Sequence, residues 1–97
     1  MESGQGQGLR LEKTFTIKNK LGLHARAASL FVQLANRFDS EILVRRNDQE
    51  VNGKSIMGIL ILAAAQGASI TLMVEGVDAH GAMNALGELI DNGFGED

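Results

Sequence analysis

Apolar and polar residues alternate from Leu11 to Lys18, a pattern typical of a half-buried β-strand, although Lys13 interrupts the apolar face. A second segment, rich in isoleucine, leucine and valine, precedes a tight turn at Asn47-Asp48, and a short segment follows that turn. Another alternating segment lies later in the chain. The pattern therefore predicts four strands, over residues 11–18, 41–47, 49–52 and 69–75.

Apolar residues spaced three and four positions apart predict helices. Ala27 and Phe31 belong to such a stripe, and the first helix is expected over residues 25–37. The last helix is expected to start after Asp78 as its N-cap and to end at Gly93. Its stripe of buried positions comprises Ala79, Ala82, Met83, Leu86, Leu89 and Ile90.

A further helix is predicted over residues 56–66, with Ser55 as its N-cap and Gly67 as its C′ residue. Its apolar residues occupy more than one face: Ile56, Met57, Ile59, Leu60, Ile61 and Leu62. One sheet cannot cover all of them, so part of this helix is expected to form a surface for a partner.

The predicted order is β-α-β-β-α-β-α, which indicates an α+β fold. We expect a two-layer, open-faced β-sandwich in which a four-stranded antiparallel sheet carries three helices on one face. The glycine-rich residues 1–10 lack any period and are predicted to be a disordered tail. Residues 11–97 are then a single domain, which suits a chain of 97 residues.

Composition excludes several classes of protein. The absence of cysteine rules out disulfides and thiolate metal sites, and the apolar run at 56–65 is too short to cross a bilayer. No secretory signal is readable at the N-terminus, so the cytoplasm is the expected location. A net charge of −3 without tryptophan or tyrosine argues against nucleic acid as a partner.

Charge is unevenly distributed along the chain. All nine lysines and arginines lie between Arg10 and Lys54, whereas the residues from Ser55 onward contain six acids and no base. A basic pole would attract phosphate and an acidic protein partner. The alternative is that the fold mixes the two parts of the sequence in space.

His24 is the main candidate for chemistry. Gly22 precedes it in a loop, a helix is predicted to start just after it, and Arg26 follows two residues later. A neutral imidazole is a nucleophile, and a helix N-terminus with an arginine favours anions. This combination suits a group that accepts and passes on a phosphoryl group. The alternative is a loop histidine that only caps a helix.

His80, the second histidine of the chain, is predicted to be exposed, and no metal site is expected.

The stretch Gly22-Leu23-His24-Ala25-Arg26-Ala27-Ala28 resembles the phosphorylation-site motif of the HPr family, the phosphohistidine carriers of the bacterial phosphoenolpyruvate:sugar phosphotransferase system. The stretch Asn52-Gly53-Lys54-Ser55-Ile56-Met57-Gly58-Ile59 resembles the regulatory-serine motif of that family, at the expected distance. The resemblance runs from about Leu11 to the end of the chain. It implies the fold predicted above, with four strands and three helices.

The resemblance also implies roles and partners. His24 would accept the phosphoryl group on its δ nitrogen from enzyme I and pass it to IIA domains, Arg26 would stabilise that group, and no cofactor would be needed. Ser55 would be phosphorylated by HPr kinase/phosphorylase. The residues implied in partner docking are Leu23, Ser29, Gln33, Lys54, Ile56 and Met57. A monomer without nucleic-acid or membrane contact is expected.

Three alternatives stay open. Ser55 can be a helix N-cap and nothing more, and Leu23, Ile56 and Met57 can belong to the core. The chain can be a regulatory interaction module of the same fold, uncoupled from sugar transport. An enzyme such as a histidine-dependent phosphatase is disfavoured because no second acid, base or metal cluster accompanies His24.

Ala27 stands where the family usually has proline, which leaves one more backbone N–H free in the first helical turn.

Overall fold

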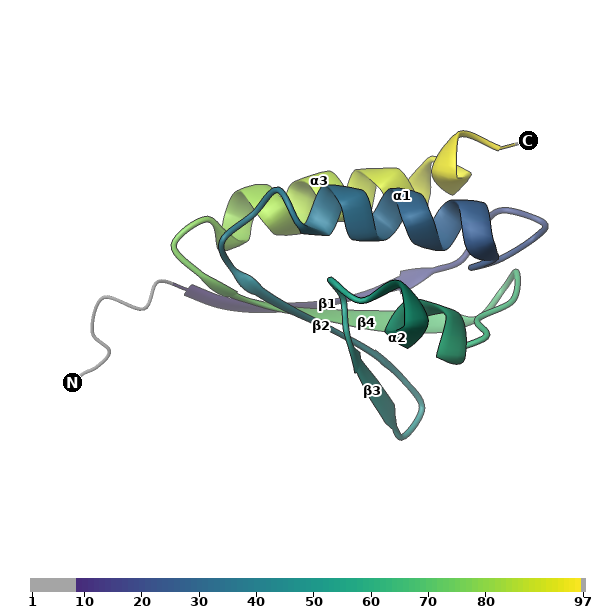
Figure 1. Cartoon of the computed structure of the whole chain (residues 1–97), viewed down its shortest axis with the longest axis horizontal. Coiled ribbons are helices and arrows are strands. Elements are labelled where there is room, and N and C mark those ends of the chain that lie inside the picture. Colours follow the sequence, from purple (N-terminus) through teal and green to yellow (C-terminus); the bar gives the residue numbers. More distant parts are fainter. Residues whose placement is uncertain (1–8, 97) are drawn as a thin grey trace.

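Two layers make up the fold in the computed structural model, which describes residues 9–96. One layer is an antiparallel sheet with the strand order β1-β4-β2-β3. Figure 1 shows the two longer helices on one side of it. The strands are β1 (Leu9–Thr16), β2 (Glu41–Arg46), β3 (Gln49–Asn52) and β4 (Ser69–Gly76). The helices are α1 (Ala25–Ala35), α2 (Ile56–Ile61), α3 (Ala79–Asp91) and the short turn η1 (Gly93–Gly95). The predicted fold class is confirmed.

The core lies between the sheet and the helices because each element presents one apolar face inward. Within β4, Ile70, Leu72 and Val74 are buried at alternate positions, and Met73 between the last two is buried as well. The stripe predicted for α3 is buried except for Leu89, which is partly exposed. The largest fully buried side chains are Phe31, Phe94, Ile17, Ile42, Ile59, Leu62, Ile70, Leu72, Leu86, Ile90, Val44 and Val74. Within residues 9–96, none of the helices has both the length and the apolar content needed to cross a membrane.

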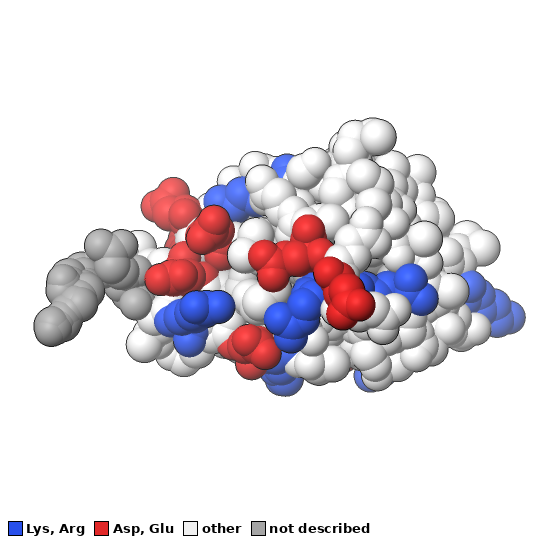
Figure 2. Space-filling model, turned by 90° about the horizontal axis from the view of Figure 1, so that it is seen from below, with Lys and Arg blue, Asp and Glu red and all other residues white. Residues whose placement is uncertain are grey.

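The opposite face of the sheet carries intermixed charges, as Figure 2 shows. Because β1 lies beside β4, Arg10 is opposite Glu75 in the register. Arg45 of β2 forms an ion pair with Glu12 of β1 at 3.6 Å. The pairing of β1 with β4 therefore places an arginine of the basic part beside a glutamate of the acidic part on this face.

Several predicted boundaries were wrong by a few residues. β1 begins at Leu9 and ends at Thr16, so residues 9 and 10 belong to the sheet and not to the predicted tail, while residues 1–8 lie outside the described part. The first helix ends at Ala35, two residues before the expected end. α2 ends at Ile61 and not at residue 66 as expected. The N–H groups of Leu62 and Ala63 donate to carbonyls three residues back, which tightens the last turn, and Ala63 has a φ of 48°.

Asp78 holds two connections together. It occupies the N-cap position of α3 as predicted, but its carboxylate makes no capping bond to that helix. The carboxylate instead accepts from the backbone N–H groups of Asp39 at 2.8 Å and Ser40 at 2.9 Å, and from the Ser40 hydroxyl. The Ser40 hydroxyl, followed by the Asp39 N–H, lowers the pKa of Asp78. The carboxylate thus joins the turn before β2 to the start of α3.

Candidate active site around His24

A tight loop delivers His24 to the start of α1. Gly22 has a φ of 66°, a conformation that glycine adopts without steric cost. Its N–H donates to the carbonyl of Asn19 at 3.1 Å, and its own carbonyl accepts from the Asn19 side-chain amide at 2.8 Å. The backbone N–H of Leu23 donates to the Ala64 carbonyl at 2.9 Å. These bonds fix the backbone on both sides of the loop.

His24 is the N-cap of α1, as predicted. Its backbone is extended, with φ −76° and ψ 180°, and its carbonyl accepts from the N–H of Ala28 at 2.8 Å. The side-chain Nδ1 accepts from the backbone N–H of Arg26 at 3.4 Å. Nδ1 therefore carries the lone pair of the neutral ring and faces the helix N-terminus, and the ring proton is on Nε2.

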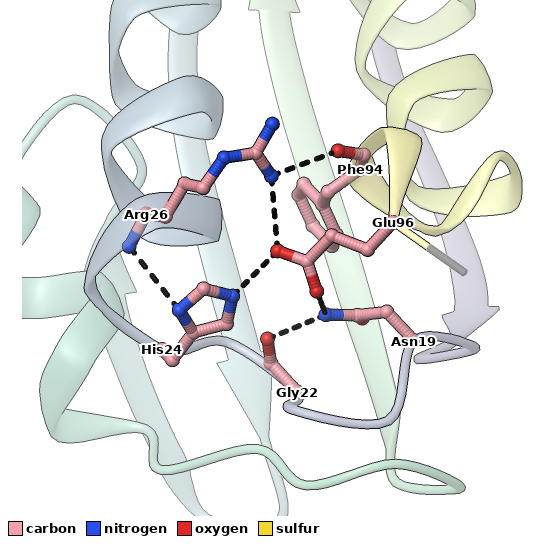
Figure 3. A network of polar contacts seen from close by, with 6 residues as sticks. All are labelled: Asn19, Gly22, His24, Arg26, Phe94 and Glu96. Carbon is pink, nitrogen blue, oxygen red and sulfur yellow. Dashed lines mark hydrogen bonds and ion pairs between the residues drawn. The ribbon is translucent and has the colours of Figure 1, made fainter.

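Glu96 lies on the other side of the imidazole ring, as Figure 3 shows. Its Oε2 is 2.6 Å from His24 Nε2 and 3.0 Å from Arg26 Nη1. Its Oε1 accepts from the Asn19 side-chain amide at 2.9 Å. Arg26 also donates to the carbonyl of Phe94 at 3.4 Å. One carboxylate from the C-terminal end of the chain thus contacts the side chains of His24, Arg26 and Asn19.

Hydrogen bonds hold Glu96 in its ionised form. The amide of Asn19 makes the largest contribution to lowering the pKa of the Glu96 carboxyl, and the ring of His24 the next largest. Partial burial, with 16% of the side chain exposed, acts in the opposite direction. Since its pKa is lowered, Glu96 is a carboxylate at neutral pH and accepts a hydrogen bond from the Nε2–H group of His24.

The arrangement suits a nucleophile that accepts an anionic group. Nδ1 is unprotonated and lies beside backbone N–H groups that have no partner inside the helix. The side chain of Arg26 is 60% exposed, so its guanidinium can rotate toward phosphoryl oxygens. Ala27 is buried in the same helical turn. Within residues 9–96, no cluster of three or more histidine, cysteine, aspartate or glutamate side chains is arranged to hold a metal ion.

The structure places the predicted docking residues in different environments. Ile56 and Met57 are exposed, Met57 at 64% of its surface. The side chains of Gln33, which is exposed, and Ser29, which is half-buried, form a hydrogen bond of 3.0 Å. Leu23 differs from the expectation of a docking residue, because it is buried in the core with only 5% of its surface exposed. Its side chain anchors the loop before His24 and does not contribute to an exposed surface.

Ser55 is the N-cap of α2, as predicted, and its hydroxyl accepts from the N–H of Gly58 at 3.2 Å. The neighbouring Lys54 directs its ammonium to the carbonyl of Phe38 at 2.6 Å. The lysine carbonyl accepts from the side-chain amide of Asn36 at 3.3 Å, so this loop is tied to the end of α1. Within the part of the chain that the structure describes, no hydrogen bond or ion pair joins Ser55 to His24.

Asn19 and Glu96 are site residues that the sequence reasoning missed. Both lie outside the strands and helices that the pattern predicted. The available signal was Phe94 between two glycines, because a large apolar residue after a helix end needs a turn to reach the core. That turn, with Gly93 and Gly95 at positive φ, brings Glu96 back to the start of α1.

Comparison with known proteins gives one consistent result. The family model "PTS HPr component phosphorylation site" matches residues 11–92. Phosphocarrier protein HPr from Neisseria meningitidis is 54% identical over 86 residues, which cover 89% of this chain and 97% of that protein. The crystal structure of HPr-C-His from Thermoanaerobacter tengcongensis has a TM-score of 0.87 and 50% identity, covering 90% of this chain and 98% of its own. A crystal structure of an HPr dimer from the same organism has a TM-score of 0.72 and 51% identity, covering 84% of this chain and 94% of its own. This chain belongs to the HPr family of phosphocarrier proteins.

Proposed function

We propose that His24 accepts a phosphoryl group from enzyme I, which takes it from phosphoenolpyruvate, and passes it to IIA domains during sugar uptake. The observation that supports this most directly is the unprotonated Nδ1 of His24 at the N-terminus of α1, with Arg26 beside it. In the first transfer, the Nδ1 lone pair attacks phosphorus and the bond to the donor breaks. In the second, an acceptor attacks phosphorus and the N–P electron pair returns to Nδ1. The chain is a stoichiometric carrier in the cytoplasm and not a catalyst.

The docking surface of this carrier is proposed to include Ile56 and Met57 of α2, with Ser29, Gln33 and Lys54 around them. The exposure of the two apolar side chains supports this, because methionine adapts to several partners. α2 packs on α1, so this surface is continuous with the helix that carries His24.

We propose that the monomer is the working form, although a solved relative is a dimer. Sedimentation at working concentrations tests this.

A second candidate function is a regulatory interaction module controlled through Ser55. The half-buried hydroxyl of Ser55 next to exposed apolar residues favours it. A phosphate there lies at a helix N-terminus, where negative charge is tolerated, so phosphorylation would change docking and leave the fold intact. Label on Ser55 from ATP and HPr kinase/phosphorylase, without turnover through His24, would favour this module over the carrier.

The test of the carrier function is labelling with radioactive phosphoenolpyruvate and a heterologous enzyme I. We expect one acid-labile, base-stable phosphate per chain, which then moves to an added IIA domain. A folded chain that takes no label from an enzyme I that labels a control HPr would contradict the proposal.

Replacing Arg26 with alanine is expected to slow phosphoryl transfer roughly 10- to 100-fold, because one charged donor to the phosphoryl oxygens is lost. Stability should change little, since the Arg26 side chain is mostly exposed. Rapid-quench measurement of transfer from phospho-enzyme I checks this. Arg10→Ala, which removes an exposed arginine of β1 opposite Glu75 on the far face of the sheet, is the matched control. Equal rates for Arg26→Ala and the control would exclude the role of Arg26.

Replacing Ser55 with aspartate is expected to weaken enzyme I binding about tenfold, because it places a carboxylate beside Ile56 and Met57 at the docking surface. Titration calorimetry with enzyme I measures the Kd. Ser69→Asp adds the same charge at an exposed position of β4 and should leave the Kd unchanged. Equal affinity of Ser55→Asp and the wild-type chain would argue against docking at this surface.

A further inference from the structure

The segment after α3 has an unusual backbone that brings Glu96 to the site. Gly93, Phe94 and Gly95 have successive φ angles of 62°, 58° and 74°, so three consecutive residues lie in the left-handed region. A bulky residue such as phenylalanine rarely adopts this conformation. Phe94 does so with 99% of its surface buried, and bonds from Gly95 N–H to Asn92 and from Glu96 N–H to Gly93 close the turn. Backbone strain of this kind persists where the surrounding structure enforces it, often at functional sites.

The contact made by Glu96 has a direct consequence for the reacting ring. When Nδ1 forms a bond to phosphorus, the imidazole uses its lone pair and becomes a cation if Nε2 keeps its proton. The Glu96 carboxylate accepts a hydrogen bond from the Nε2–H group at 2.6 Å and is held there by Asn19 and Arg26. The negative charge therefore lies where positive charge develops during phosphorylation. This is the kind of preorganised electrostatic contact that stabilises a charged state.

We propose that Glu96 is a positioning residue of phosphoryl transfer, which keeps the proton on Nε2 of His24 while Nδ1 carries the phosphoryl group. This inference rests on the proposed carrier function and extends it to the C-terminal turn. Arg26 leaves Glu96 to bind the phosphoryl oxygens, and Glu96 stays on the ring. The protonated ring then departs from phosphorus as neutral imidazole, since the N–P electron pair returns to Nδ1 and the proton remains on Nε2.

The charged groups that contact the ring are few. Among the described residues, Arg26 from α1 and Glu96 after η1 are the charged side chains in contact with it or with its partner. Asn19, from the loop after β1, is uncharged and holds Glu96 in place. Loss of the Glu96 charge therefore changes the dominant electrostatic contact of Nε2.

The test is the pH dependence of hydrolysis of phospho-His24. The wild-type chain, Glu96→Gln, Glu96→Asp and Glu88→Gln are labelled with enzyme I and phosphoenolpyruvate, purified, and followed by release of inorganic phosphate. Because hydrolysis is fast when the ring is protonated, the rate falls as pH rises. Without the Glu96 charge, the midpoint of this fall should move to lower pH by about one unit. Glu96→Asp should show a smaller displacement, because it keeps the charge on a shorter side chain.

Glu88→Gln is the matched control, since it removes the same charge from an exposed position of α3. Its midpoint should equal that of the wild-type chain. A Glu96→Gln profile that superimposes on the wild-type profile would overturn the inference, as would an equal displacement in Glu88→Gln. A wild-type chain that takes no label would overturn the carrier function and this inference with it. A labelled wild-type chain with an unchanged Glu96→Gln profile overturns the inference alone.

Discussion

Replacing His24 with alanine is expected to reduce acid-labile phosphoryl labelling from phosphoenolpyruvate and enzyme I by at least roughly 10³-fold. The remaining label should equal the background measured without enzyme I. The reason is geometric, because the proposed nucleophile, His24 Nδ1, lies at the N-terminus of α1 beside Arg26. An alanine also removes the capping bond to the Arg26 N–H, which should cost about 1 kcal/mol of stability. Labelling is measured on folded protein, with unfolding curves recorded in parallel.

The control for this experiment is His80→Ala. His80 is the other histidine of the chain and is exposed on α3, so its loss should leave labelling unchanged. Acid-labile label that persists in His24→Ala and disappears in His80→Ala would contradict the assignment of His24. Label that persists in both variants would place the phosphoryl group on another side chain and would contradict it as well.

Local signals explain how much of the fold was predictable. Alternation in the strands and the three- and four-residue spacing in α1 and α3 identified these elements, since each depends on residues close in sequence. The capping positions of His24 and Ser55 were predicted for the same reason. The end of α2 was not, because apolar residues continue past Ile61 while Ala63 adopts a positive φ. Nothing in the hydrophobic pattern marks that change in backbone direction.

The candidate site was predictable only in part, because half of it is assembled from distant segments. His24 and Arg26 are two residues apart, whereas Glu96 lies 72 residues after His24 and reaches it through the turn around Phe94. Leu23 illustrates the opposite error. The motif places it beside His24, but only the packing of the loop shows that its side chain faces the core.

Replacing Gly22 with alanine is expected to lower the free energy of unfolding by roughly 3 kcal/mol. Two costs combine at this position. The φ of 66° disfavours any residue with a Cβ, and a Cβ there would lie 2.4 Å from the Ala64 carbonyl oxygen and 2.9 Å from the Cα of Ala65. Both neighbours are backbone atoms, so the loop must shift. That shift breaks the bond between the Leu23 N–H and the Ala64 carbonyl and displaces His24. Urea unfolding measures the stability, and labelling by enzyme I measures the displacement.

Gly67→Ala separates these two costs. Gly67 has a φ of 89°, but a Cβ added there meets no atom within 4 Å. This variant should lose only about 1 kcal/mol from the left-handed conformation and should be labelled at the wild-type rate. The difference between the two variants is then the cost of the close approach between the loop and the segment after α2. If both variants lost the same stability, or if Gly22→Ala were labelled as fast as Gly67→Ala, the loop would not depend on that approach to position His24.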